Sequence, residues 1–170
     1  MRNGILWGVL LLILAVVNSQ IVGKELILDQ GGTMLLELAP RDPRSLLQGD
    51  YMALRYRMTD EVGRNLSNVA SADGHAVVRL GEYGVASFVR VHNANTPIGV
   101  GEKLLYFRKR GESVRVASDA FFFQEGDGEV YRNARYGELR VDGDGSAVLV
   151  GLRDGAFDAL RAKEMASATD

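Results

Sequence analysis

The chain has 170 residues, of which 25% are charged, and a formal net charge of -2, a size and balance ordinary for one globular domain. It has no basic excess, which argues against a nucleic-acid partner. It has no cysteine either, which excludes disulfides, thiolate metal sites and a cysteine nucleophile.

The N-terminal segment is apolar enough to lie in a membrane. Residues 4–17 are uninterrupted apolar positions, and Ile21 and Val22 follow a short polar interruption. A helix over residues 4–22 would span about 28 Å, which nearly matches a hydrocarbon core of about 30 Å. We therefore predict a transmembrane anchor over 4–22, after an N-terminus (1–3) on the cytoplasmic side. The helix is expected to extend to about residue 30, where two glycines supply a stop.

A cleaved signal peptide stays open as the alternative. The apolar run has the length of a signal-peptide core, and residues 17–19 offer a small residue at a cleavage edge. The helical spacing of Ile21, Val22, Leu26 and Ile27 favours the anchor, because a cleaved segment has no need to continue as a helix. Both interpretations export the rest of the chain. A single N-terminal anchor before one long polar domain favours an N-in, C-out orientation.

From Thr33 onward the pattern is that of short strands. Alternating or short apolar runs occupy residues 34–38, 50–58, 75–80, 85–91, 103–108, 113–117, 138–141 and 147–152, and glycine-bearing turns separate many of them. This predicts a mainly β domain over residues 33–165, an antiparallel sandwich or partly open barrel with short helices. Residues 126–137 fit one or two helical turns, Ala156 to Leu160 a short terminal helix, and 166–170 a frayed tail.

One segment stands out from the others, namely Gly49-Asp50-Tyr51-Met52-Ala53-Leu54-Arg55-Tyr56, which fits G-D-Y-x-x-L-x-Y without a mismatch. Period-two alternation places Met52, Leu54, Tyr56 and Met58 on one face and Tyr51 on the other. We expect Leu54 and Tyr56 to fill the core. Gly49 and Asp50 are expected to shape the turn that leads into the strand.

With this segment the chain resembles the bacterial GDYxxLxY family, membrane-anchored proteins whose function is not established. The apolar anchor and the approach to the motif, Pro40-Arg-Asp42-Pro43-Arg44, are also similar to the family. So is an aromatic segment that ends in Glu-Gly, although Gln124 stands where a proline is expected; its residues are Phe121, Phe122, Phe123, Glu125 and Gly126. The resemblance covers roughly three quarters of the chain. It implies a single-pass protein of the bacterial inner membrane, with the domain in the periplasm and a multi-spanning membrane protein as partner.

Two interpretations of the signature remain open. The favoured one is a folding device, a rigid loop that leads into a central strand. The other is a binding surface built from Asp42, Arg44, Asp50 and Tyr51. In either case the residues of interest are Pro40, Asp42, Pro43, Arg44, Gly49, Asp50, Tyr51, Leu54 and Tyr56.

No complete set of catalytic or metal-binding residues is visible in the sequence. His75 and His92 are isolated, and the Asp142-Gly-Asp-Gly segment lacks the glycine and the terminal acid of a calcium loop. Ser45 ahead of Gly49-Asp50 faintly resembles the serine–lysine signal peptidases. Those enzymes need a serine further upstream, where this chain has Arg41 and Pro40, and a lysine base; Lys24, Lys103, Lys109 and Lys163 stand in no matching context. We expect no catalytic residue, cofactor or metal.

The sequence therefore supports three hypotheses in descending order. The first is a non-enzymatic, membrane-anchored module that binds an integral membrane protein. The second is a cell-envelope ligand-binding or sensing domain, in which the aromatic run from Phe121 to Phe123 forms a platform for the ligand. A hydrolase comes last.

Overall fold

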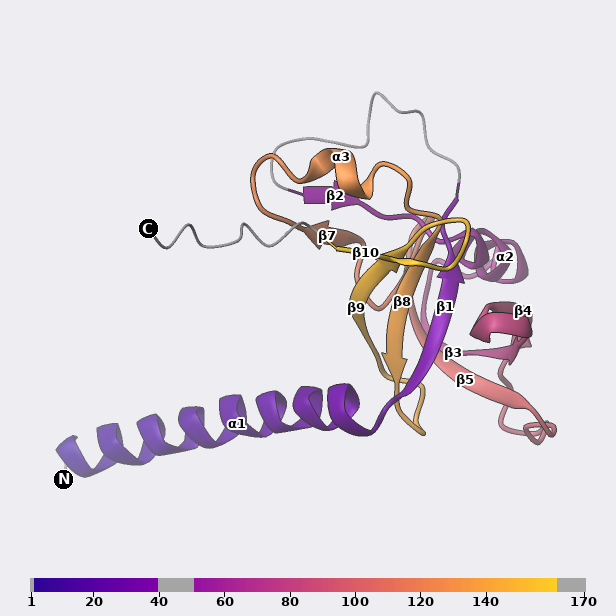
Figure 1. Ribbon diagram of the computed structural model, residues 1–170. Coiled ribbons are helices and arrows are strands. Elements are labelled where there is room, and N and C mark those ends of the chain that lie inside the picture. The colour runs from indigo at the N-terminus through magenta and orange to yellow at the C-terminus, as the bar shows by residue number, and fades with distance from the viewer. Residues whose placement is uncertain (1, 40–50, 162–170) are drawn as a thin grey trace, which may run out of the picture.

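The structure, a computed structural model that describes residues 2–39 and 51–161, consists of a long N-terminal helix and a β-rich domain (Figure 1). The elements in chain order are α1 (Arg2–Gln30), β1 (Gly32–Glu37), β2 (Tyr51–Ala53), α2 (Arg57–Asn65), β3 (Ser71–Leu80), the 3₁₀ turn η2 (Glu82–Gly84), β4 (Ala86–Val91), β5 (Glu102–Arg110), β6 (Ser113–Val116), β7 (Ala120–Phe122), α3 (Gly128–Tyr131), β8 (Tyr136–Val141), β9 (Ala147–Arg153) and β10 (Ala159–Leu160).

The strands form three antiparallel sheets. One has the order β1-β8-β9-β10, a second has the order β4-β3-β5-β6, and β2 pairs with β7 in a separate two-stranded ribbon. The two larger sheets meet along β1, where Leu35 makes an isolated bridge to Val85 just before β4. The predicted mainly β, antiparallel fold with short helices is confirmed, and the sheets curve as parts of an open barrel.

Helix α1 is continuous across the predicted membrane segment and beyond it. Within the described residues it is long and apolar enough to cross a membrane, over Trp7–Gln30. From Trp7 onward its side chains are exposed except that of Ile27. It ends at Gln30, next to the predicted glycine stop, and the Gly31 N–H still donates to the Ile27 carbonyl at 2.9 Å. A Cβ at position 31 would lie 2.3 Å from that oxygen, so the close approach requires glycine.

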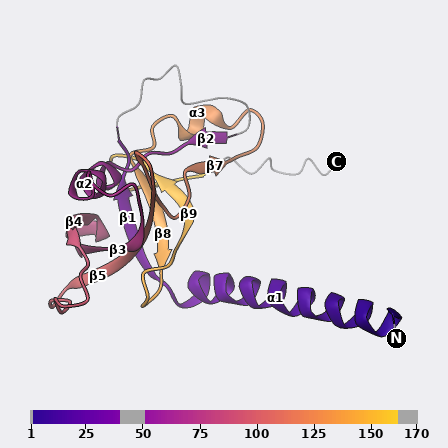
Figure 2. The ribbon, with the colours of Figure 1, turned by 180° about the vertical axis from the view of Figure 1, so that it is seen from behind.

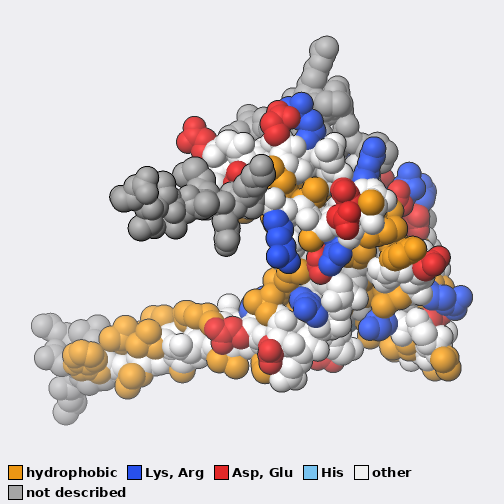
Figure 3. Space-filling model, in the orientation of Figure 1, with side chains coloured by type: hydrophobic (Ala, Val, Ile, Leu, Met, Phe, Trp, Pro, Cys, Tyr) orange, Lys and Arg blue, Asp and Glu red, His pale blue; other side chains and the backbone are white. Residues whose placement is uncertain are grey.

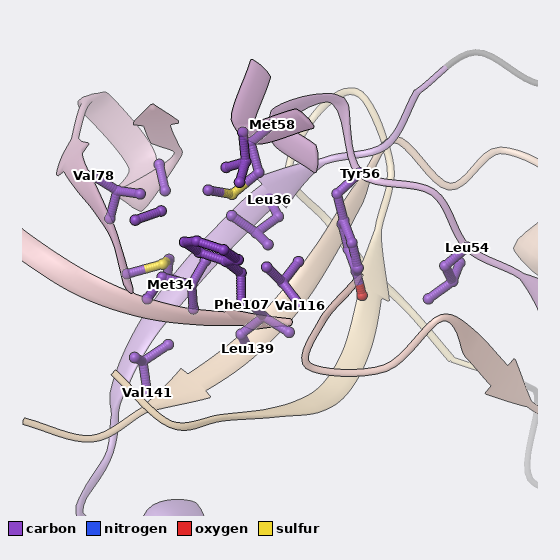
Figure 4. Packing of buried hydrophobic residues seen from close by; sticks show 14 of the residues in the cluster. Met34, Leu36, Leu54, Tyr56, Met58, Val78, Phe107, Val116, Leu139 and Val141 are labelled. Carbon is purple, nitrogen blue, oxygen red and sulfur yellow. The ribbon is translucent and has the colours of Figure 1, made fainter. Parts of the chain in front are cut away.

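The core lies between the two larger sheets. Met34 and Leu36 from β1 and Leu139 from β8 face Leu105 and Phe107 from β5, all with at most 1% of their surface exposed. Figure 4 shows the ring of Phe107 among Met34, Leu36 and Val116. Burial of this many large apolar side chains is the dominant favourable term that holds the two sheets together.

The predicted strand over residues 50–58 is too long. In the structure β2 covers only Tyr51–Ala53, Tyr56 makes a single antiparallel bridge to Leu38, and α2 begins at Arg57. The predicted burial is nevertheless confirmed, since Met52, Leu54, Tyr56 and Met58 are all buried. The missed signal for α2 is the helical spacing of Met58, Val62 and Leu66, which puts them on one face of the helix against the core.

The predicted terminal helix near Ala156 is wrong. Residues 159–160 form β10, which pairs with Arg153 and Leu152 of β9. The connection is a tight turn, because the Asp154 carboxylate accepts hydrogen bonds from the backbone N–H groups of Ala156 and Asp158. An aspartate side chain that accepts a hydrogen bond from the backbone N–H two residues further on favours a turn over a helix. The helical turn predicted within 126–137 is present as α3.

Candidate functional site

The signature strand and the aromatic run, which were separate candidates in the sequence, pair with each other. In the β2–β7 ribbon Tyr51 lies opposite Phe122, Met52 opposite Phe121, and Ala53 opposite Ala120. The Leu54 N–H extends the pairing by donating to the Asp119 carbonyl at 2.7 Å. The ribbon therefore joins the two sets of residues in one element.

The alternation of β7 splits the three phenylalanines between two environments. Phe121 and Phe123 pack against Tyr131 of α3, with ring centroids 5.0 Å and 5.3 Å away, and both rest on the core. Phe122 points outward and is 74% exposed. The run therefore has a structural part and an exposed part, because successive residues of a strand face opposite sides.

The exposed face of the ribbon carries an aromatic pair. Tyr51 is 37% exposed, and its ring centroid lies 5.8 Å from that of Phe122 in a tilted arrangement. The two rings are direct cross-strand neighbours, which is a favourable arrangement on the surface of a sheet. Neither ring belongs to the core cluster that the described residues form.

Tyr56, at the end of the signature, has a structural role. Its side chain is buried, and its hydroxyl donates to the Ser118 carbonyl at 3.0 Å. Its ring lies against Gly137 of β8, where an added Cβ would come within 2.9 Å of ring atom Cε1. Burial, and to a lesser extent the charge of Asp119, raises the pKa of Tyr56 above its ordinary value. Together these contacts fix the end of the signature segment to two other parts of the domain.

A hollow of about 510 Å³ lies beside the signature strand. Its lining includes Met52 and Leu54 from the signature, Tyr131 from α3, and the charged residues Arg135 and Asp154. Among the described lining residues Tyr131 is the one aromatic side chain, and none of Phe121 to Phe123 lines this hollow.

Other sequence candidates have local explanations or lie outside the described residues. Pro40, Asp42, Pro43, Arg44, Gly49 and Asp50 fall within 40–50, which the structure does not describe. Glu125 and Gly126 belong to the turn after β7, in which the Asp127 N–H donates to the Gln124 carbonyl. Gly126 has φ +94°, a backbone angle that other residues rarely adopt, which explains the glycine there.

The lysines that were considered for a serine–lysine mechanism are spread over the molecule. Lys24 lies on α1, and Lys103 and Lys109 lie on β5. Lys109 is buried on the core side of the strand, and its Nζ donates to the Gly111 carbonyl. Ser45 and Lys163 lie outside the described residues. Among the residues that the structure describes, no group of three or more His, Cys, Asp or Glu side chains is placed to hold a metal ion.

A second aromatic cluster was not foreseen from the sequence. The rings of Tyr83 and Phe157 stack with centroids 4.5 Å apart, and the ring of Tyr136 also stacks with Phe157, at 4.9 Å. Tyr83 and Phe157 both have positive φ, +59° and +68°, which is costly for residues other than glycine. The stack attaches the turn before β10 to η2 and β8, so it explains why these two strained positions persist.

The fold and the site together define a class: an antiparallel β-domain that carries a GDYxxLxY strand and follows an N-terminal helix long enough to cross a membrane. A family model described as "GDYXXLXY protein" matches residues 13–152, and the chain belongs to this family. The match includes most of α1 and nearly all of the β-domain. Comparison with curated proteins and with solved structures gave no match.

Proposed function

We propose that this chain is a single-pass protein of the bacterial inner membrane, with its N-terminus in the cytoplasm and its β-domain in the periplasm. We further propose that it is a non-enzymatic module that binds an integral membrane protein through the exposed aromatic face of the β2–β7 ribbon. The length and apolar surface of α1 support the anchor. The sequence offers no complete catalytic set, which favours binding over catalysis.

The position of the ribbon supports a partner in the membrane. If residues 4–22 cross the hydrocarbon, residues 23–30 carry the helix about 12 Å further, roughly through the headgroup region. Figures 1 and 2 both show β2 and β7 on the side of the domain from which α1 extends. With the proposed topology, this side of the domain is turned toward the bilayer, which supports a membrane-embedded partner.

The single observation that carries this proposal is the exposed pair of Tyr51 and Phe122. The folding role of the signature is accounted for by the buried Met52, Leu54 and Tyr56, so it does not explain the ring at position 51. Aromatic side chains are enriched among the residues that dominate binding energy at protein interfaces. Two adjacent exposed rings, one of them from the signature itself, fit such an interface.

Site-specific photo-crosslinking in intact cells tests the proposal. Phe122 is replaced by a photo-crosslinking phenylalanine analogue, and the same analogue at position 83 serves as the matched control, because Tyr83 is also an exposed ring but lies outside the ribbon. We expect position 122 to crosslink to a multi-spanning membrane protein, position 83 not to do so, and Tyr51→Ala to abolish the product. Equal crosslinking at both positions would contradict the proposal. So would extraction of the protein from the membrane in mild detergent without any bound partner.

A cell-envelope ligand-binding domain is the second candidate. The observation that favours it is the hollow of about 510 Å³, which Met52 and Leu54 help to line. In that case Arg135→Ala, at the wall of the hollow, would impair function in cells, and Phe122→Ala would not. The partner hypothesis predicts the reverse, so one complementation assay with both variants separates the two candidates.

A further inference from the structure

A groove of about 810 Å³ separates α1 from the body of the domain. Lys24 of α1 lies on one wall, β5 and β6 contribute Arg108, Arg110 and Arg115, and Asp119 lies on the connection that leads to β7. Figure 3 shows α1 extending from one side of the domain, with open space beside it.

The basic side chains come together because of strand alternation and register. On β5, Leu105, Phe107 and Lys109 face the core, so Arg108 and Arg110 lie on the outer face. The β5–β6 register then puts Arg108 directly opposite Arg115. Like charges at opposite positions of an antiparallel pair are unfavourable, and an anion bound between them relieves this repulsion.

The acidic residues near the groove neutralise only part of this charge. Asp73 pairs with Arg110 at 2.6 Å and lies 4.0 Å from Arg108, and Asp119 pairs with Arg115 at 3.1 Å. Among the described residues no salt bridge involves Lys24. Four basic side chains thus face two carboxylates among the described residues, which leaves an excess of positive charge in the groove. Within that part of the chain Lys24 has no salt bridge, and Arg108 has the long 4.0 Å contact to Asp73, which Asp73 shares with Arg110.

We propose that this groove binds the phosphodiester headgroup of an anionic phospholipid. Lys24 stands two residues beyond Val22, the end of the predicted membrane segment, so the groove lies at the level of the headgroups. The guanidinium groups of Arg108 and Arg115 can each offer paired N–H donors to phosphate oxygens. Basic side chains next to a membrane helix bind anionic lipid by this attraction. The inference rests on the proposed anchor but not on the proposed partner.

Lipid titration of the delipidated full-length protein in neutral detergent, followed by native mass spectrometry, tests this site. We expect phosphatidylglycerol to bind at least about tenfold more tightly than phosphatidylcholine, with a preference that weakens as salt is raised. Arg108→Gln/Arg115→Gln should reduce the phosphatidylglycerol affinity about tenfold and leave phosphatidylcholine binding unchanged. Arg57→Gln/Arg132→Gln is the matched control, since both arginines are exposed, each pairs with one carboxylate, and neither lines the groove.

Two further measurements distinguish a lipid site in the groove from the alternatives. Lys24→Gln changes an exposed residue of α1 outside the β-domain and should lower the lipid affinity severalfold without affecting the thermal unfolding of that domain. Inorganic phosphate is titrated separately, and we expect binding far weaker than that of the lipid. Equal binding of the two lipids, a preference that survives in the groove variants, or phosphate binding as tight as lipid binding would each overturn the assignment. Because no partner protein is present, the result is independent of the crosslinking experiment.

Discussion

The ring of Tyr56 lies directly on Gly137, and a Cβ at position 137 would come 2.9 Å from Tyr56 Cε1 and 3.3 Å from Leu149 Cδ1. The last residue of the signature is thus accommodated by a glycine on a strand far away in sequence. This contact couples the signature segment to β8, so the packing of Tyr56 depends on the fold of the whole domain.

Gly137→Ala should destabilise the domain by about 1–3 kcal/mol, because the new methyl group overpacks a site bounded by a buried ring. Chemical denaturation measures the change. Gly143→Ala is the control, since nothing lies within 4 Å of its Cβ position, and it should stay within about 0.5 kcal/mol of the wild type. Equal effects of the two substitutions would show that Tyr56 does not need the space above Gly137.

Leu54→Ala should cost about 2–5 kcal/mol, because it removes a buried side chain and leaves a cavity. Tyr51→Ala should cost distinctly less, since Tyr51 is partly exposed at the ribbon surface, but it should impair partner binding. The two denaturation midpoints are compared alongside a complementation assay. If both variants lose stability equally and activity follows stability, the signature is a folding device alone.

Tyr56→Phe should weaken the domain by about 0.5–1.5 kcal/mol at neutral pH, because the hydrogen bond to the Ser118 carbonyl is lost. The variant should also change the response to alkali. The pKa of Tyr56 is raised in the folded state, so its contribution is complete below the ordinary value of 10.0 and decreases as the pH rises above that value. Wild-type stability should therefore fall more steeply than that of Tyr56→Phe above pH 10, as measured by urea denaturation at each pH. Parallel curves would mean that the folded state does not shift this pKa.

A reporter that is active only outside the cytoplasm should be active when fused after Asp170, and a reporter that works only in the cytoplasm should be inactive there. The N-terminal sequence of the mature protein is measured on the same material. We expect α1 to be retained whole, because it continues unbroken from Arg2 to Gln30. A mature chain that begins at Gln20 would establish the signal-peptide alternative, and the reverse reporter pattern would contradict the exported domain.

Much of the local structure was determined by the sequence alone. The apolar run and the stop at Gly31 define α1, and turn residues joined to alternating strands define the β8–β9 hairpin. The alternation of residues 52–58 correctly predicted which side chains are buried, even though the strand was assigned too long. These features depend on residues close in sequence, whose periodicity reports directly on the face that is buried.

Only the tertiary structure decided how distant segments meet. The pairing of Tyr51 with Phe122, the fit of Tyr56 on Gly137 and the approach of Lys24 to Arg108 join positions far apart in the chain. Several alternative pairings satisfy the same local patterns, and packing of the whole core selects one of them. The change from strand to helix at Arg57 had a local signal in the helical spacing of Met58 and Val62, but the same residues also fit a strand, and the core on which they pack selected the helix. The residues proposed to act in binding therefore came together only in the folded domain.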